Sequence, residues 1–146
     1  MTRQILIDDP ADPRLQDYRE VRERDIAGRD GFIAEGQVVL EKLIRGGHPL
    51  RSVLVAEKRL AALGGLLAEL PPDVPVFAAG QEVMDTVVGF PIHRGILAVG
   101  ERRPLDAEAL VRGLPERALV VGLVGIANHD NMGGLFRNAA AFGADA

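Results

Sequence analysis

Apolar and polar positions along the middle of the chain follow two periodicities, and together they predict an α/β fold. Short apolar runs of strand length are followed by segments whose apolar residues lie three or four positions apart, as in helices that bury one face. The predicted strands are 32–34, 51–56, 74–78 and 95–99. The predicted helices are 37–45, 58–70 and 81–88. Strands that alternate with helices at this spacing are typical of a sheet covered by helices.

The segments on either side of this region have a different pattern. The first 30 residues are charged and weakly periodic, and they predict a turn-rich lead-in followed by a charged helix from Pro13 or Arg14 to Ile26. After residue 100, an Arg-Arg-Pro sequence predicts a linker with a short helix at 106–112. We therefore expect four parts: an N-terminal extension (1–30), a first domain (31–100), a linker (101–117) and the start of a second domain (118–146).

The end of the chain predicts one strand–turn–helix unit of a parallel sheet. Residues 118–124 form an apolar run of strand length, and a polar turn and a helix with apolar positions follow. Asn131 is the expected N-cap residue, and Gly133 leaves the first turn without a side chain. Arg137 comes four residues after Gly133, so its guanidinium should lie over that bare turn. The apolar residues between 135 and 142 are expected to pack against the sheet.

This pattern, Asn-x-Gly-x-x-x-Arg-x-Ala-x-x-Phe-Gly over residues 131–143, resembles the first motif of the SpoU (TrmH-like) branch of the SPOUT RNA methyltransferases. Residues 32–36 and 89–98 are similar to the start and the end of that family's substrate-binding domain. The resemblance covers roughly residues 30–146. The chain departs from the family pattern at His129, where many relatives have proline, and at Arg94, where many have glutamine.

The resemblance implies a fold and an activity. The fold would be a small ribosomal-protein-like α/β/α substrate-binding domain, followed by the first strand and helix of a trefoil-knotted methyltransferase domain. The activity would be transfer of a methyl group from S-adenosylmethionine to a ribose 2′-hydroxyl of tRNA or rRNA, in a homodimer. Later motifs build the S-adenosylmethionine pocket in the family. We therefore expect that pocket beyond residue 146, no cofactor-binding residue in this chain, and no activity from this chain alone.

The resemblance also implies catalytic roles for Arg137 and Asn131. An arginine can hydrogen-bond the ribose hydroxyl or the adjacent phosphate and favour the developing oxyanion. A guanidinium hardly loses its proton at neutral pH, so positioning is easier for Arg137 than acting as the base. Asn131 would shape the RNA site beside it.

Four further residues are candidate RNA contacts: Glu35, His93, Arg94 and Asn128. Each has a simpler alternative. The alternative for Glu35 is that it complements the dipole of the helix that follows it and makes no RNA contact. The His93–Arg94 pair could hold a phosphate or be a solvated surface pair. Asn128 could only stabilise its turn by bonding to nearby backbone.

Composition narrows the function further. The net charge is −4, which argues against indiscriminate binding of a polyanion, so RNA contact has to come from a local patch. The absence of cysteine excludes disulfides and thiolate metal sites, and the three histidines have no metal-ligand spacing. No apolar stretch approaches the roughly 20 residues of a membrane helix. We expect a cytoplasmic protein without metal or membrane contact; the alternative to an enzyme is a non-catalytic RNA-binding module.

Overall fold

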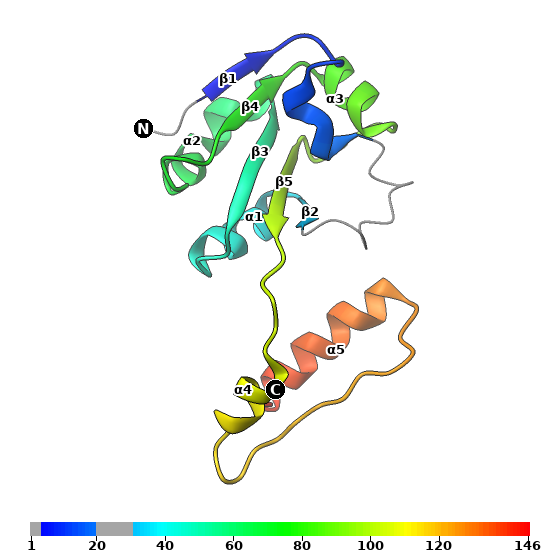
Figure 1. Cartoon of the computed structure of the whole chain (residues 1–146). Helices are drawn as coiled ribbons and strands as arrows, with labels where there is room; N and C mark the ends of the chain where they lie inside the picture. The colour runs from blue at the N-terminus through cyan, green and yellow to red at the C-terminus, as the bar shows by residue number, and fades with distance from the viewer. Residues whose placement is uncertain (1–3, 20–30) are drawn as a thin grey trace. The chain divides into compact units, whose positions relative to one another are not determined.

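The chain forms two compact units. The computed structural model describes residues 4–19 and 31–146, with side chains at all of these except 129 and 130. Unit 1 is Met1–Arg102 and unit 2 is Arg103–Ala146 (Figure 1). The sheet lies in unit 1, whereas the described part of unit 2 contains only helices and irregular segments.

Unit 1 is built on a mixed five-stranded sheet in the order β1-β4-β3-β5-β2. The strands are β1 (Gln4–Ile7), β2 (Gly31–Glu35), β3 (Leu50–Ala56), β4 (Val76–Ala79) and β5 (Ile96–Glu101). β4 runs parallel to both β1 and β3, whereas β5 runs antiparallel to both β3 and β2. It follows that β2 and β3 point the same way on either side of β5, so both end at the edge where β5 begins.

Helices cover both faces of the sheet, and β3 shows how the faces are separated. Val53 and Val55 pack with α1 (Gln37–Arg45) and α2 (Leu60–Ala68). Leu54 and Ala56 face the other way and pack with the 3₁₀ helix η1 (Pro13–Tyr18) and α3 (Gln81–Val88). Successive side chains of a strand point to opposite faces, so the apolar run Val53–Ala56 of β3 contributes to both cores.

Most of the predicted elements of unit 1 are confirmed. The helices at 37–45 and 81–88 have the predicted bounds, and the four predicted strands form with ends shifted by one or two residues. The predicted helix at 58–70 is instead a 3₁₀ turn, η3 (Glu57–Arg59), followed by α2, which ends at Ala68. Such shifts are expected where helix ends tighten into 3₁₀ geometry.

The prediction of a charged helix from Pro13 or Arg14 to Ile26 is wrong for the residues of this segment that the structure describes. A 3₁₀ helix ends at Tyr18 and Arg19 is extended, while 20–26 lie outside the described residues. Leu15 and Tyr18 are three positions apart and fully buried, as in a helix with three residues per turn. Asp12 caps the helix by accepting from the backbone N–H of Arg14 at 2.9 Å. Hydrogen bonds from Arg14 hold the pKa of Asp12 at about 2.

The N-terminal segment also contributes to the sheet, which its sequence did not predict. β1 pairs with β4 at the edge of the sheet, and Ile7 is buried in the same core as Leu15 and Tyr18. The described residues 4–18 are therefore part of the folded unit 1.

Unit 2 contains two helices, α4 (Ala107–Arg112) and α5 (His129–Ala141). The first confirms the short helix predicted at 106–112. Its N-cap residue is Asp106, whose carboxylate accepts from the N–H of Ala109 at 2.9 Å.

The strand predicted at 118–124 does not form. A few bonds join this segment to residues 145 and 146. Val121 N–H donates to the Ala146 carbonyl and Asp145 N–H to the Leu119 carbonyl, each at 2.8 Å. Leu119 N–H donates to the Asp145 carboxylate at 2.9 Å, and Ala146 N–H makes a long bond of 3.5 Å to the Leu119 carbonyl. Residue numbers rise together along both segments, so they run in parallel. The prediction is wrong because a strand needs a continuous partner, and in the described chain two residues are too few to form a ladder.

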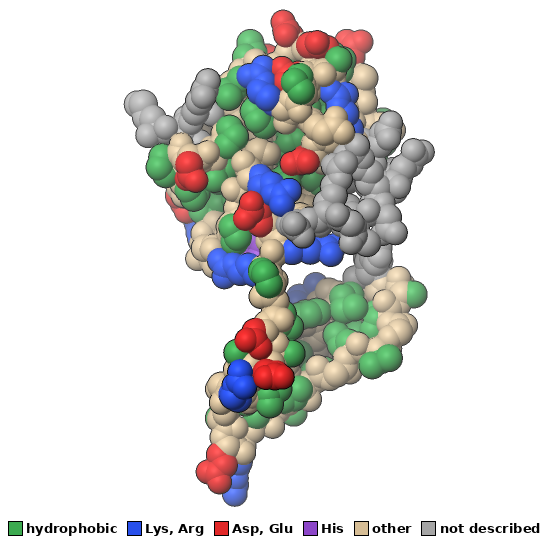
Figure 2. Space-filling model, in the orientation of Figure 1, with side chains coloured by type: hydrophobic (Ala, Val, Ile, Leu, Met, Phe, Trp, Pro, Cys, Tyr) green, Lys and Arg blue, Asp and Glu red, His purple; other side chains and the backbone are tan. Residues whose placement is uncertain are grey.

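Apolar side chains of unit 2 are open to solvent, contrary to the predicted packing of α5 against a sheet (Figure 2). Phe136 is 66% exposed, Phe142 81% and Val124 92%. In unit 1, by contrast, each helix buries apolar side chains in one of the two cores, although Val38 and Val39 of α1 are exposed. No helix within the described residues has both the length and the apolar character needed to cross a membrane.

Candidate functional site

A pocket of about 480 Å³ lies where β2 and β3 end and β5 begins. Three predicted site residues, Glu35, His93 and Arg94, line it together although they are almost 60 positions apart in the sequence. The remaining lining residues come from the start of α1 and from η3: Gly36, Gln37, Val38, Val39 and Arg59. The structure therefore brings the three predicted residues of unit 1 into one site.

The sheet topology explains why these segments meet. The N–H of Gly36 donates to the Ile96 carbonyl at 3.1 Å, which ties the end of β2 to the start of β5. The N–H of Ala56 donates to the Gly95 carbonyl at 2.9 Å, which ties the end of β3 to the same point. Loops at the carboxyl ends of strands are common ligand sites in α/β proteins.

At two glycines with positive φ, arginine side chains lie directly against the backbone beside the pocket. At Gly36, with φ of 100°, a Cβ atom would lie only 3.1 Å from Cδ of Arg94. At Gly95, with φ of 64°, it would lie 3.3 Å from Cγ of Arg59. Glycine suits both positions because it tolerates this conformation and leaves room for the arginine stems.

The charged groups of the pocket are not neutralised by one another. Within the described chain, neither Arg59, Arg94 nor Glu35 forms an ion pair. Nη2 of Arg59 donates to Oε1 of Gln37 at 3.4 Å, a long bond, while its Nε is buried without a partner among the described residues. Leaving a buried donor unpaired costs about 1–3 kcal/mol. Unpaired guanidinium groups beside a helix start favour an anion.

Arg59 was missed from the sequence. It follows a strand by three residues in a segment with the charged sequence Glu57-Lys58-Arg59, which looks like an ordinary solvated turn. The signal that could have revealed it is topological: β3 has to end at the same edge as β2. An alternating strand–helix pattern does not show that β5 lies between them.

In unit 2 the predicted position of Arg137 is confirmed. Its guanidinium lies over the two glycines that follow the first turn of α5, with Nη1 3.5 Å from where a Cβ of Gly133 would be and Nη2 3.9 Å from that of Gly134. The side chain itself is exposed. A side chain at either glycine would crowd the guanidinium.

The predicted N-cap role of Asn131 is wrong, because α5 begins two residues earlier, at His129. Asn128 takes this role: its side-chain oxygen accepts from the N–H of Asn131 at 3.3 Å. The stabilising role considered for Asn128 is thus confirmed, and Asn131 lies inside the first turn. Asn128, Asn131 and Arg137 all belong to unit 2, whereas Glu35, His93 and Arg94 belong to unit 1.

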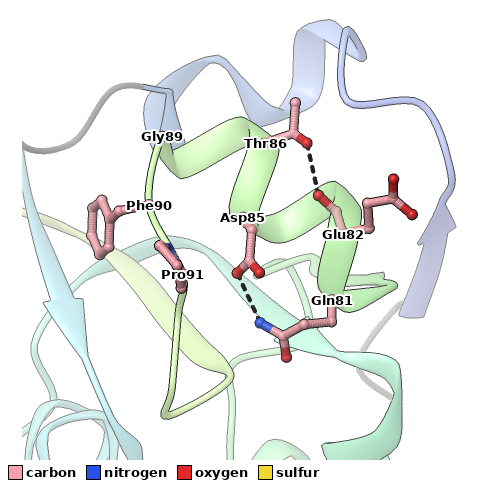
Figure 3. A pocket seen from close by; sticks show the side chains of 7 residues that line it. All are labelled: Gln81, Glu82, Asp85, Thr86, Gly89, Phe90 and Pro91. Carbon is pink, nitrogen blue, oxygen red and sulfur yellow. Dashed lines mark hydrogen bonds between the residues drawn. The ribbon is translucent and has the colours of Figure 1, made fainter.

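A second depression, of about 660 Å³, lies along α3, and its polar groups are used internally (Figure 3). Asp85 accepts from Nε2 of Gln81 and from the N–H of Ile92, both at 2.8 Å, and Gln81 also donates to the Ile92 carbonyl at 2.9 Å. These bonds fix the loop after α3. No three His, Cys, Asp or Glu side chains gather as metal ligands within residues 4–19 and 31–146.

Comparisons with known proteins identify relatives of the chain. No protein-family model matches it. Uncharacterized tRNA/rRNA methyltransferases of Mycobacterium bovis and Mycobacterium tuberculosis are 35% identical to it over 143 residues. The match covers 94% of the chain and 48% of each relative, so the chain spans about half their length.

Solved structures show the same fold. An RNA 2′-O ribose methyltransferase matches with a TM-score of 0.65 and 21% identity, over 96% of the chain and 53% of its own length. An rRNA methyltransferase from Sinorhizobium meliloti matches with a TM-score of 0.68 and 15% identity, over 97% of the chain and 53% of its own length. A structure of an rRNA methyltransferase from that organism with bound AdoMet has a TM-score of 0.64 and 15% identity, over 97% of the chain and 52% of its own length. The chain is therefore similar, over nearly all of its residues, to about half of each of these mycobacterial tRNA/rRNA methyltransferases.

Proposed function

We propose that this protein is an RNA 2′-O-ribose methyltransferase of the SpoU branch, acting on tRNA or rRNA with S-adenosylmethionine as the methyl donor. The observation that supports this most directly is Arg137 lying over the glycine turn of α5, in a chain related to tRNA/rRNA methyltransferases. Because Gly133 and Gly134 have no side chains, the guanidinium can approach a ribose and its phosphate without obstruction from that turn.

The two units would have different functions, RNA binding and methyl transfer. Residues 31–100 would be the ribosomal-protein-like domain that binds the RNA substrate, with Glu35, His93 and Arg94 in its pocket. Residues 101–117 would be the linker, and 118–146 the start of the knotted methyltransferase domain, which dimerises in the family the chain resembles. The parallel bonds between 119–121 and 145–146 fit the start of a strand–helix–strand unit.

Arg137 would act by positioning. Its planar fork can hold the ribose hydroxyl and the adjacent phosphate at the same time, and its charge favours the oxygen as it becomes negative. Asn131 would line the same turn of α5, and Asn128 would contribute by fixing the start of the helix. A proton acceptor is a separate requirement, because a guanidinium stays protonated at neutral pH.

S-adenosylmethionine would supply the methyl group. One depression in this unit is lined by a face of α4: Ala107, Glu108, Val111 and Arg112. One face of a six-residue helix cannot surround a nucleoside, so this depression is not a candidate for the cofactor site. As the family resemblance implies, we assign the cofactor pocket to later motifs of the family fold, and we derive no step through it.

The test is to map ribose methylation in total RNA from cells with the gene intact and with it deleted. We expect one or a few 2′-O-methylated riboses to disappear on deletion and to return when the gene is restored. An Arg137→Ala gene should not restore them, and Arg137→Lys should restore little, because a point charge cannot replace the fork.

Arg112→Ala is the matched control, since Arg112 lies in the same unit and is exposed beside Glu108 at 3.3 Å. It should restore methylation fully. An unchanged methylation map on deletion would contradict the enzymatic proposal; RNA binding without any change in the map would favour the alternative, a non-catalytic RNA-binding module. Full restoration of methylation by the Arg137→Ala gene would contradict the catalytic role proposed for Arg137.

A further inference from the structure

The pocket at the ends of β2 and β3 contains an arginine to which neither the sequence nor the family resemblance assigned a role. We propose that Arg59 anchors a single phosphodiester of the RNA backbone in this pocket, together with Arg94. The inference rests on the proposed function, since it names what the pocket of unit 1 holds. It makes Arg59 an RNA-binding residue in addition to Glu35, His93 and Arg94.

The first argument is the state of the Arg59 side chain. Its Nε is buried and has no hydrogen-bond partner among the described residues, and its Nη2 has only the 3.4 Å bond to Gln37. Its Cγ lies 3.3 Å from where a Cβ of Gly95 would be, so the stem is held against bare backbone while the guanidinium lines the pocket. Native structures rarely leave such a donor unused, so a missing acceptor is expected here.

The second argument is the number of donors around the same space. The guanidinium of Arg94 also lines the pocket, and its stem is positioned by the absence of a side chain at Gly36. No side chain caps the start of α1, and Gln37, Val38 and Val39 of its first turn line the pocket as well. The N–H groups of an uncapped first turn add to the positive potential there.

The third argument is charge, and it selects the kind of phosphate. Two guanidinium groups and the carboxylate of Glu35 give the pocket a formal charge of +1, with His93 counted as neutral. A phosphodiester has one negative charge and matches this. A free phosphate or a terminal phosphate carries nearly two at neutral pH and meets the carboxylate of Glu35 as well. The balance therefore favours the RNA backbone over a free phosphate.

The experiment measures binding of a fluorescent RNA hairpin to the 146-residue chain between about 50 and 200 mM KCl. Arg59→Gln should weaken binding about 10-fold at low salt. It should also lower the slope of log K against log [KCl] by about 0.7–0.9, the value of one phosphate contact. Arg59→Lys keeps the charge and loses the fork, so it should weaken binding while keeping the slope.

Arg45→Gln is the matched control, because Arg45 lies at the other end of α1 and is engaged by Glu41 and Glu69. It should leave affinity and slope unchanged. If Arg59→Gln binds like the wild type, the inference is wrong while the proposed function stands. If the wild-type chain binds no RNA, the inference is wrong, while the methylation map of the deletion strain still decides the proposed function.

Two further readouts keep the outcome decisive. Near-ultraviolet circular dichroism reports whether Arg59→Gln is folded; if it is not, Arg59→Lys decides, and an unchanged affinity in that variant overturns the proposal. Inorganic phosphate is added as a competitor. Weak competition by millimolar phosphate supports a phosphodiester site, and competition as strong as that of unlabelled RNA assigns the pocket to free phosphate and overturns the proposal.

Discussion

At the scale of single residues, the hydroxyl of Tyr18 is a buried polar group with a buried hydrogen-bond partner. The side chain is fully buried and its hydroxyl lies 2.7 Å from the hydroxyl of Ser52, which is 7% exposed. Burial raises the pKa of Tyr18 far above its ordinary value, and the hydrogen bond to Ser52 only partly opposes this. The pair joins the N-terminal segment to β3, since 34 positions separate the two residues.

Replacing Tyr18 by phenylalanine should lower the free energy of unfolding by about 1–3 kcal/mol, because Ser52 is left buried without its partner. Since the folded pKa is raised, this tyrosine stabilises the fold below its unfolded pKa of about 10, and the stabilisation is lost as pH rises above that. The advantage of wild type over Tyr18→Phe should shrink by about 1.4 kcal/mol per pH unit there. Urea unfolding at several pH values measures both effects.

The double variant Tyr18→Phe with Ser52→Ala is the control. It removes both partners of the bond and should recover part of the loss. Equal stability of all three proteins at every pH would contradict the role of this bond. Tyr18 is the only tyrosine, so its ultraviolet titration is a direct check on the raised pKa.

At this scale, the sequence predicted positions that depend on residues a few places apart in the chain, and it missed positions that depend on the order of strands in the sheet. The position of Arg137 over Gly133 follows from four-residue spacing on one helix, and it was predicted. Asn128 and Asn131 are only three positions apart, and either can cap a helix, so the pattern placed the cap one helical turn too late. Arg59 depended on which strands are neighbours in the sheet, and local spacing does not contain that information.

At the scale of elements, the contact between β2 and β5 shows how a glycine and a ring fit together. Phe32 of β2 lies directly opposite Gly100 of β5. A Cβ at Gly100 would lie 2.3 Å from Cζ of the Phe32 ring, so the ring covers the glycine. The edge of the same ring contacts His48, with 5.3 Å between the ring centroids. The glycine thus provides room that the aromatic side chain fills.

Gly100→Ala should lower the free energy of unfolding by about 1–3 kcal/mol, because the ring has to leave its place. Gly65→Ala is the matched control in α2, where a Cβ would meet nothing within 4 Å. It should raise the free energy of unfolding by about 0.5–1 kcal/mol, since alanine is the better helix former. Chemical denaturation of the two variants measures both changes, and a shift in the same direction for both would contradict the packing argument.

Element type was predictable from the sequence where periodicity and burial agreed. The bounds of α1 and α3 follow from apolar spacing and from the glycines that end them, Gly46 and Gly89. The segment 118–124 has the composition of a strand, yet strand formation requires a partner that the described chain supplies only at Asp145 and Ala146. The opposite error occurred at β1, where a strand forms that the sequence did not predict. Four residues are too few to show a periodicity, and β1 is a strand because it pairs with β4.

At the scale of the whole molecule, net charge and local charge point in different directions. The chain has a net charge of −4 and pI of about 5.4, so long-range attraction of RNA is not expected from its overall field. The pocket of unit 1 nevertheless combines two arginines and one carboxylate. The RNA binding that we propose would therefore depend on local contacts, and the test of Arg59 measures single phosphate contacts through the salt slope.

The two units also differ in how much apolar surface they bury, and amide hydrogen exchange should reveal it. α3 buries Met84, Val87 and Val88, whereas α5 exposes Phe136. Opening a helix that buries few apolar side chains costs little free energy, so its amides exchange quickly. We expect the amides of α5 to exchange more than ~10-fold faster than those of α3, although α5 is the longer helix.

Exchange measured at two protein concentrations is the control. Rates in α5 that do not depend on concentration support an apolar face left uncovered within the chain. Slower exchange in α5 at the higher concentration would show that a second copy covers this face. Equal protection of α3 and α5 at low concentration would contradict the prediction, because the exposed side chains of α5 could not then be the reason for its opening.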